Sequence, residues 1–253
     1  MKPALFLSDL HLSPVRPAAA AAFHAFARGP ARDAAAVYIL GDLFDWWLGD
    51  DQLREPFAAG IAASLRAITS AGVPVFVARG NRDFLLGEAF ERATGARLLP
   101  EQQIIEAGGT PTLLLHGDEL CTDDIDYQRY RARMRTPRAA RRLLALPYAV
   151  RRLIAWYLRR ASRGANALKP EAILDVSDAA VAAAFRTQGV TRMIHGHTHR
   201  PARHRHDVDG VARERIVLAD WHDRGHYVEV GDEGMHDREI AAPLRSSAPA
   251  APD

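Results

Sequence analysis

Five short clusters of acidic, histidine and asparagine residues carry the side chains that this sequence could use for chemistry. The clusters are Asp9 with His11; Gly41, Asp42 and Asp45; Gly80 to Asp83; His116 to Asp118; and His195, His197 and His199. Carboxylate, imidazole and amide groups together suit hard to borderline divalent cations, and none of the clusters contains cysteine. Five unrelated polar turns would explain this set poorly, so the clusters predict a metal centre.

Each cluster directly follows a short apolar run that is typical of a buried strand. The runs are residues 4–7, 37–40, 75–78, 112–115 and 193–194. Stretches of helical composition at 17–28, 53–71 and 87–94 lie between the first four runs. This alternation predicts an α/β fold in which the sheet is covered on both faces. Because ligands bind beyond the carboxyl ends of strands in open α/β sheets, we expect the five clusters to meet at one rim.

The second half of the chain has a different pattern. Residues 124–135 and 138–163 are helical and basic, with a break near Pro147, and residues 177–188 form another helix that stops at Gly189. Further strands are predicted at 216–219 and 227–230, and disorder at 244–253. With 253 residues, 48% of them hydrophobic, and one cysteine, the composition excludes collagen, a coiled coil and a disulfide scaffold. No apolar run approaches about 18 residues, so no membrane-spanning helix is expected.

Positive charge is concentrated in one segment. Residues 127–170 contain twelve arginines, one lysine and no acid, a net charge of +13 in a chain whose total is +2. A basic block of this kind suggests a polyanionic partner, and nucleic acid, acidic lipid and phosphate ligands all qualify. Arginine mixed with tryptophan and leucine on a helix suits a membrane surface, whereas a helical cap with a solvated basic face is the alternative.

Taken together, the five clusters resemble the motifs of the calcineurin-like metallophosphoesterase family. The resemblance implies an α/β fold, a β-sandwich flanked by helices in an αββα arrangement. Residues 1–243 would form one domain, with a helical lid inserted at about 124–170. One departure is Arg82, because the common pattern has a histidine after the asparagine. Arginine cannot act as a general acid near neutral pH.

The resemblance also implies two metal ions, with Mn²⁺ as the expected metal. The implied ligands are Asp9, His11 and His199 for one ion, Asn81, His116 and His197 for the other, and Asp42 as a bridge between them. Asp45 and Asp118 are expected to orient ligands. The roles of His195 and His222 stay open.

Three segments narrow the resemblance to a subfamily of pyrophosphatases that act on UDP-2,3-diacylglucosamine in the lipid A synthesis of Gram-negative bacteria. These segments are residues 81–83, 116–124 and 195–201, joined by the helical insertion. The implied reaction is attack of a water, activated by two metal ions, on the α-phosphorus, which gives UMP and 2,3-diacylglucosamine 1-phosphate. The implied catalytic residues are Asp42, Asn81, Arg82, His116 and His197. The implied substrate contacts are Asn81, Arg82, Asp124, Ser162, Asn166, Lys169 and His197. The fork of Arg82 would hold phosphate oxygens and stabilise developing charge.

Partners and location follow from the same resemblance. The lid is expected to hold the two acyl chains of the substrate and to rest on anionic lipid at the cytoplasmic face of the bacterial inner membrane, as a peripheral protein. No nucleic-acid partner is expected. No sequence feature reports the oligomeric state, for which a monomer is slightly favoured.

Two alternatives stay open. A metallophosphoesterase for a nucleotide or a phosphoprotein would need an open site, and the long apolar and basic insertion argues against one. A non-catalytic binder of nucleic acid or membrane is compatible with the basic segment. Such a binder, however, has no use for a complete set of seven metal ligands.

Overall fold

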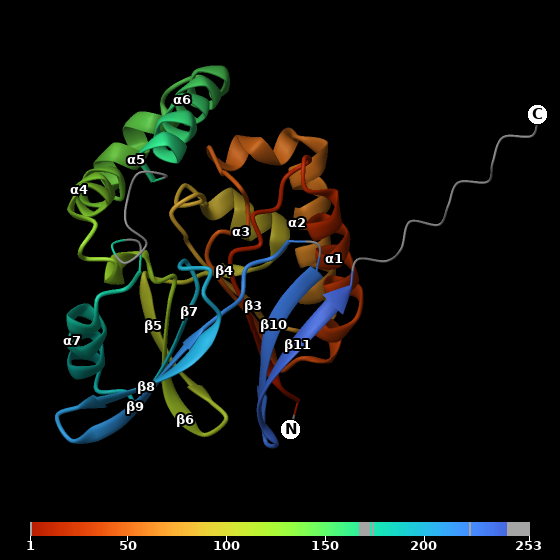
Figure 1. Cartoon of the computed structure of the whole chain (residues 1–253). Coiled ribbons are helices and arrows are strands. Elements are labelled where there is room, and N and C mark those ends of the chain that lie inside the picture. Colours follow the sequence, from red (N-terminus) through yellow and green to blue (C-terminus); the bar gives the residue numbers. More distant parts are fainter. Residues whose placement is uncertain (1, 167–172, 174, 223, 242–253) are drawn as a thin grey trace, which may run out of the picture.

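Two β-sheets pack face to face, and helices cover the outer face of each (Figure 1). The computed structural model describes residues 2–166, 173, 175–222 and 224–241. Helices α1 (Pro17–Arg28), α2 (Pro56–Ser70) and α3 (Glu88–Thr94) lie on the side of the first sheet, and α7 (Asp178–Gln188) lies on the second. The predicted αββα sandwich of a metallophosphoesterase is thereby confirmed.

The first sheet has the strand order β11-β10-β1-β2-β3-β4. Its strands are β1 (Ala4–Leu7), β2 (Ala36–Leu40), β3 (Val75–Ala78), β4 (Arg97–Leu98), β10 (Arg224–Gly231) and β11 (Gly234–Ala241). Strands β1 to β4 run parallel, so their carboxyl ends lie at the same edge. This order explains why the clusters that follow β1, β2 and β3 become neighbours.

The second sheet has the strand order β5-β6-β7-β9-β8. Its strands are β5 (Gln102–Ala107), β6 (Thr110–Leu115), β7 (Arg192–His195), β8 (Ala202–Val208) and β9 (Val211–Val217). The central strands β6, β7 and β9 are parallel, and the clusters that follow β6 and β7 lie at their carboxyl ends. The expected rim is therefore shared by two sheets instead of belonging to one.

Alternating side chains along the strands build three hydrophobic layers. On β1, Leu5 and Leu7 pack toward α1 and α2, whereas Phe6 points between the sheets. On β6, Leu114 meets Phe6 in the same middle layer, and Leu113 and Leu115 pack on α7. Both faces of each sheet are thus covered, by helices on one side and by the other sheet on the other side. This is why the central strands read as unbroken apolar runs.

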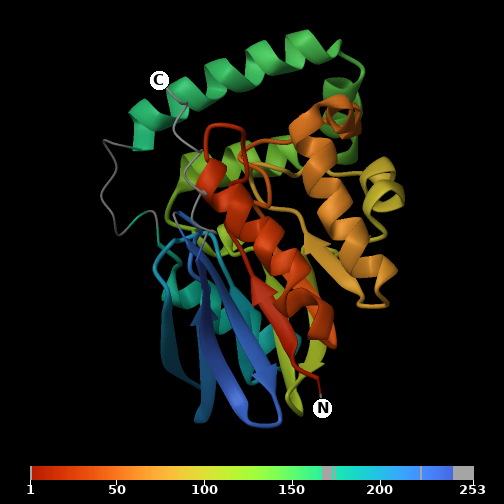
Figure 2. The same cartoon turned by 90° about the vertical axis from the view of Figure 1, so that its right-hand side faces the viewer.

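Three helices are inserted between β6 and α7 and lie above the rim (Figures 1 and 2). They are α4 (Ile125–Met134), α5 (Pro137–Leu144) and α6 (Tyr148–Asn166). The predicted break near Pro147 separates α5 from α6. Side-chain contacts hold the start of α6 to the body: buried Arg151 pairs with Asp51, and the Tyr148 hydroxyl donates to Glu55 at 2.7 Å. We refer to α4–α6 as the insertion.

Two predicted element boundaries need correction, and the structure does not test two further predictions. The helix predicted at 53–71 starts later, because residues 53 and 54 belong to a 3₁₀ turn (Asp50–Arg54) and α2 starts at Pro56, where proline suits the first helical position. The strand expected at 216–219 ends at Val217. Residues 244–253 lie outside the described residues, and the division into a single domain stays a prediction. None of the described helices is long and apolar enough to cross a membrane.

Candidate metal centre

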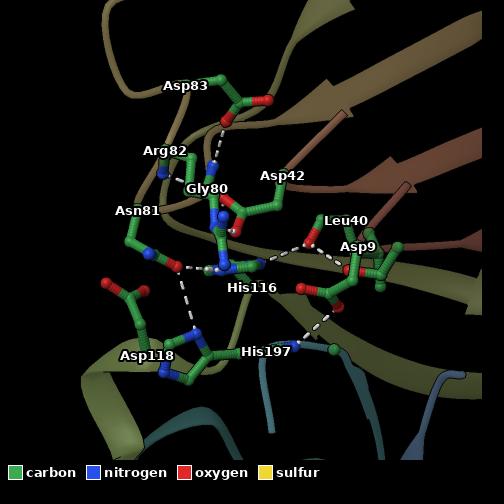
Figure 3. A network of polar contacts seen from close by, with 12 residues as sticks. Asp9, Leu40, Asp42, Gly80, Asn81, Arg82, Asp83, His116, Asp118 and His197 are labelled. Carbon is green, nitrogen blue, oxygen red and sulfur yellow. Dashed lines mark hydrogen bonds and ion pairs between the residues drawn. The ribbon is translucent and has the colours of Figure 1, made fainter. Parts of the chain in front are cut away.

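All seven predicted ligands come together at the rim. Asp9 and His11 follow β1, Asp42 follows β2, and Asn81 follows β3, all from the first sheet. From the second sheet, His116 follows β6, and His197 and His199 follow β7 (Figure 3 shows five of the seven). Asp9, His11, Asp42 and His116 are at most 4% exposed.

Five of these seven residues have an unusual backbone conformation. Their φ angles lie between 48° and 70°, in the left-handed region that residues other than glycine seldom adopt. The five residues are Asp9, His11, Asp42, His197 and His199. Such residues cost about 1–3 kcal/mol each and persist only where the surroundings hold them. Backbone hydrogen bonds between the loops stabilise this conformation, for instance from Asp9 N to Gly41 O at 3.2 Å and from His11 N to Asp42 O at 2.9 Å. The loops are thus arranged to point side chains into one space.

One group of donors consists of Asp9, His11 and His199. The Nε2 atoms of the two histidines are 3.2 Å apart, and Asp9 Oδ1 lies 3.3 Å from His199 Nε2 and 3.9 Å from His11 Nε2. These three atoms lie close enough to share one ion. Their side chains are those predicted for the first metal.

A second group surrounds Asn81. Its Oδ1 atom lies 3.0 Å from His116 Nε2 and 3.1 Å from His197 Nδ1 (Figure 3). Asp42 Oδ1 is 3.8 Å from His116 Nε2, and Asp42 Oδ2 is 3.7 Å from His11 Nδ1. Asp42 therefore lies between the two groups, where a bridging ligand would have to be.

Burial and neighbouring charges set the protonation of these groups without a metal. Burial lowers the pKa of His11 to about 2 and that of His197 to about 4, with the Arg82 and His116 charges adding to the effect. Burial raises the pKa of Asp42 to about 7, against the opposing charge of His116. Although burial opposes its charge, His199 has a pKa raised to about 10 by the neighbouring carboxylates of Asp220 and Asp9. Burial lowers the pKa of His116 as well, but the Asp42 and Asp9 charges outweigh it and raise that pKa overall. His11 and His197 are thus ready as neutral imidazoles, whereas Asp42, His116 and His199 must lose protons before they can bind a cation.

The donor set fits divalent metal ions. His116 Nδ1 donates to the Leu40 carbonyl at 2.9 Å, so in the neutral ring the Nε2 lone pair faces another acceptor, Asn81 Oδ1. Asp9 Oδ1 and His11 Nδ1 are buried without a hydrogen-bond partner among the described residues. Acceptors facing one another in a buried place are unfavourable unless a cation lies between them.

The Asp83 side chain links the loop after β2 to the loop after β3. Its buried carboxylate accepts hydrogen bonds from Leu43 N at 2.8 Å and from Gly80 N at 2.7 Å. Gly80 lies directly against Asp42, and a Cβ atom there would collide with the Asp42 carboxylate. Gly196 has the same relation to Asp9. These two glycines are required by close approach, which explains their positions beside the ligands.

Asp220 is a site residue that the sequence analysis missed. Its Oδ2 atom lies 3.2 Å from His199 Nδ1 and 2.8 Å from His222 Nε2. It fixes the ring of a predicted ligand, which is the usual task of a carboxylate beside a metal-bound histidine. The signal was available, because Asp220 directly follows the strand predicted at 216–219. His195, whose role was left open, is buried and donates from Nδ1 to Gly196 O at 2.8 Å.

Arg82 lies beside the Asp42 carboxylate. Its backbone N–H donates to Asp42 Oδ1 at 2.9 Å, and Nη1 donates to Asp45 Oδ1 at 2.9 Å. The side chain is 36% exposed, so a ligand at the rim can reach it. Asp45, which was expected to orient metal ligands, contacts Arg82.

The predicted substrate contacts in the insertion have different outcomes. Asp124 is buried and caps α4 by accepting from Tyr127 N at 3.1 Å. The side chains of Ser162 and Asn166, and the whole of Lys169, lie outside the described residues. Asp118 accepts hydrogen bonds from Tyr127 and Arg131 of α4 and forms an ion pair with Arg135 at the end of that helix, which ties the insertion to the loop after β6.

Comparison with known proteins identifies relatives along nearly the whole chain. The model of the calcineurin-like phosphoesterase family matches residues 2–201. A UDP-2,3-diacylglucosamine hydrolase from Cellvibrio japonicus is 46% identical over 231 residues, which cover 91% of this chain and 96% of that protein. Proteins of the same name from Escherichia fergusonii and Nitrosococcus oceani are 46% and 47% identical. They cover 89% and 91% of this chain, and 94% and 92% of their own lengths.

Metal binding should release more protons at pH 6 than at pH 8. With pKa values of about 7 for Asp42 and about 10 for His199, both are protonated at pH 6, whereas at pH 8 mainly His199 is. Isothermal titration of the metal-free protein with Mn²⁺, in buffers of different ionisation enthalpy, measures the number of protons released. His116, whose pKa is also raised, adds to the release at the lower pH. Equal release at both pH values would show that neither Asp42 nor His116 changes its protonation between pH 6 and pH 8.

Proposed function

This chain belongs to the calcineurin-like phosphoesterase family, and we propose that it is a metal-dependent hydrolase that cleaves the pyrophosphate of UDP-2,3-diacylglucosamine. The products would be UMP and 2,3-diacylglucosamine 1-phosphate. The observation that carries the proposal is the convergence of seven residues with oxygen and nitrogen ligand atoms at the rim, in a chain that also carries a helical insertion. Relatives that bear this activity in their names match both the rim and the insertion, because the similarity covers about nine-tenths of the chain.

Two Mn²⁺ ions are the proposed cofactors. Oxygen and imidazole ligands without thiolate agree with this metal. Asp9, His11 and His199 would hold one ion, Asn81, His116 and His197 the other, and Asp42 both. When bound, such a pair lowers the pKa of a water and neutralises charge on phosphoryl oxygens.

The protein's own contribution to the reaction lies in Arg82 and in the rigid loops. The Arg82 guanidinium stands beside Asp42 and can donate to phosphate oxygens as negative charge develops on them. A sugar phosphate leaves with little need for protonation, so a histidine at this position is dispensable for this substrate.

An apolar cavity supports a lipid substrate. It measures about 430 Å³ and lies between residues 84–87, which follow β3, and the insertion, with Arg79, Glu101 and Arg135 as its charged lining. Its apolar lining comes from both parts of the chain and includes Phe84, Leu85, Leu99, Met134, Ala140 and Leu144. We propose that it takes an acyl chain of the substrate, since burying methylene groups there is favourable.

The outer face of α6 supports contact with a membrane. Leu153, Trp156 and Tyr157 are 66%, 54% and 66% exposed, and Arg152 and Arg160 are exposed on the same helix. Apolar side chains interleaved with arginine suit the surface of an anionic bilayer. We propose peripheral binding to the cytoplasmic face of the bacterial inner membrane, with the insertion as the contact.

The reaction can be tested by UMP release from UDP-2,3-diacylglucosamine in detergent. We expect release with Mn²⁺, none with EDTA, and a loss on the order of 100- to 1000-fold in Asp42→Ala. Asp33→Ala, which removes an exposed carboxylate, is the matched control and should behave as wild type. Cleavage of a generic phosphodiester without cleavage of the lipid would keep the metal centre and reject the substrate. Hydrolysis of neither would favour a binding protein.

The acyl-chain site is tested by filling the cavity. Ala140→Trp should raise the KM for the diacylated substrate about tenfold or more, because the indole occupies space that an acyl chain needs. Hydrolysis of bis(p-nitrophenyl) phosphate, which has no acyl chain, should be unchanged. The control is Ala145→Trp at an exposed position beyond the same helix. An unchanged KM for the lipid in Ala140→Trp would place the acyl chains elsewhere.

Membrane contact is tested by sedimentation with lipid vesicles. The wild-type protein should bind phosphatidylglycerol vesicles more tightly than phosphatidylcholine vesicles. Replacing Leu153 and Trp156 by serine should weaken binding by about tenfold or more, since two large apolar side chains lose their burial. Val211→Ser, at an exposed apolar residue of the β8–β9 hairpin, serves as control. Equal binding of all three proteins would argue against the α6 face.

A further inference from the structure

Asp118 is a buried carboxylate on which one face of α4 converges. Its Oδ2 atom accepts from the Tyr127 hydroxyl at 2.6 Å, from Arg131 Nε at 2.9 Å and pairs with Arg135 Nη2 at 2.9 Å. The spacing of four residues places these three side chains on one face of the helix. Gln128 adds a bond from its amide to the Asp118 carbonyl at 2.8 Å. Helix α4 is thereby attached to the loop that begins with the predicted ligand His116.

The other oxygen of this carboxylate is directed differently. Asp118 Oδ1 is buried and has no hydrogen-bond partner among the described residues. The carboxylate lies beside Asn81 and His197 in the close view (Figure 3), and its charge acts on His116 and His197. Oδ2 of Asp118 therefore binds side chains of the insertion, while Oδ1 is left without a hydrogen bond beside the predicted second metal site.

Tyr127 makes a second contact with that site. Its ring stacks on the His197 imidazole, with 6.2 Å between ring centroids and 26° between planes. The His197 ring also contacts the His116 ring edge-on, with 5.0 Å between the ring centroids. Burial raises the pKa of the Tyr127 hydroxyl far above its ordinary value, so the group stays a donor to Asp118. A single side chain from the insertion thus touches one predicted ligand and anchors the loop of another.

His197 needs such support. Its φ angle is 70°, so its own backbone conformation is unfavourable and does not by itself fix the direction of the ring. The first predicted site is supported by a different residue, because Asp220 holds the His199 ring from the β9–β10 loop. Support of the two sites therefore comes from separate parts of the fold.

We propose that Tyr127 and Asp118 are positioning residues that couple the seating of α4 to metal affinity at the site formed by Asn81, His116 and His197. The inference rests on the di-metal centre of the proposed function, and not on the identity of the substrate. Coupling of this kind is reciprocal. Loss of the α4 contacts should weaken that metal site, and metal at that site should hold α4 more firmly.

The first experiment is a titration of the metal-free, full-length protein with Mn²⁺, with the free ion followed by electron paramagnetic resonance. Wild type should show two binding steps. Tyr127→Ala should weaken one step by about 10- to 100-fold and leave the other unchanged, as is usual when the support of a metal ligand is removed. Tyr127→Phe keeps the ring on His197 and loses only the hydrogen bond to Asp118. Its affinity at the weakened step should therefore lie between that of wild type and that of Tyr127→Ala.

The matched control is Tyr130→Ala, on the same helix at a position that is 41% exposed. It should leave both steps at their wild-type values. A second measurement is amide hydrogen exchange in residues 125–134, with and without Mn²⁺. Exchange should slow on metal addition in wild type, and this dependence should disappear in Tyr127→Ala.

The outcomes separate the inference from its premise. Two unchanged steps in Tyr127→Ala, or equal weakening of both steps, would overturn the inference and leave the metal centre intact. Exchange in α4 that is independent of Mn²⁺ in wild type would overturn it as well. Fewer than two ions bound by wild type would instead reject the di-metal centre, and the inference with it. If Tyr127→Ala does not fold, Tyr127→Phe and Arg135→Met supply the same comparison with smaller changes.

Discussion

The close approach of two buried carboxylates, Asp9 and Asp42, is the constraint on which the rest of the structure depends. Ligand atoms of both acids and of His116 lie within 4.8 Å of one another, in a place with almost no solvent. Like charges so placed repel, and burial adds to the cost unless a cation compensates. Neighbouring residues accommodate these two carboxylates. Gly80 and Gly196 give the two carboxylates room, and histidines stand where further ligands of a cation would be needed.

The insertion uses its positive charge in two ways. The basic segment was first a sign of a polyanionic partner, but several of its arginines have partners inside the protein. Arg131 and Arg135 pair with Asp118 and Glu101, and Arg151 is buried against Asp51. These pairs fasten the insertion to the body. The arginines exposed on α4, α5 and α6 are the ones a phosphate or an anionic lipid can meet, so the net charge of +13 overstates the attraction.

The sequence predicted the central strands and missed the edges, for a physical reason. Strands β1, β2, β3, β6 and β7 are buried on both faces and appear as apolar runs. The four missed strands, β4, β5, β8 and β11, are all sheet edges, where exposed positions accept polar residues. The ligands were predictable because each follows a central strand. Asp220 was missed because a single aspartate after a strand looks like a turn, and the Tyr127–Asp118 contact depends on how α4 packs, which local sequence does not encode.

Arg82 shows how a family site can be adapted without a proton donor at that position. Its fork contacts Asp45 and lies 3.4 Å from Asp42, so it already faces the place where phosphate charge would appear. His199, whose pKa is raised to about 10, is tied to Asp9 and Asp220 and is a predicted ligand, so it is no substitute acid. The site is therefore suited to leaving groups that depart as anions. A phosphate monoester is weakly basic and leaves without a proton, whereas an alkoxide is strongly basic and needs one, so this site should cleave simple alkyl phosphodiesters poorly.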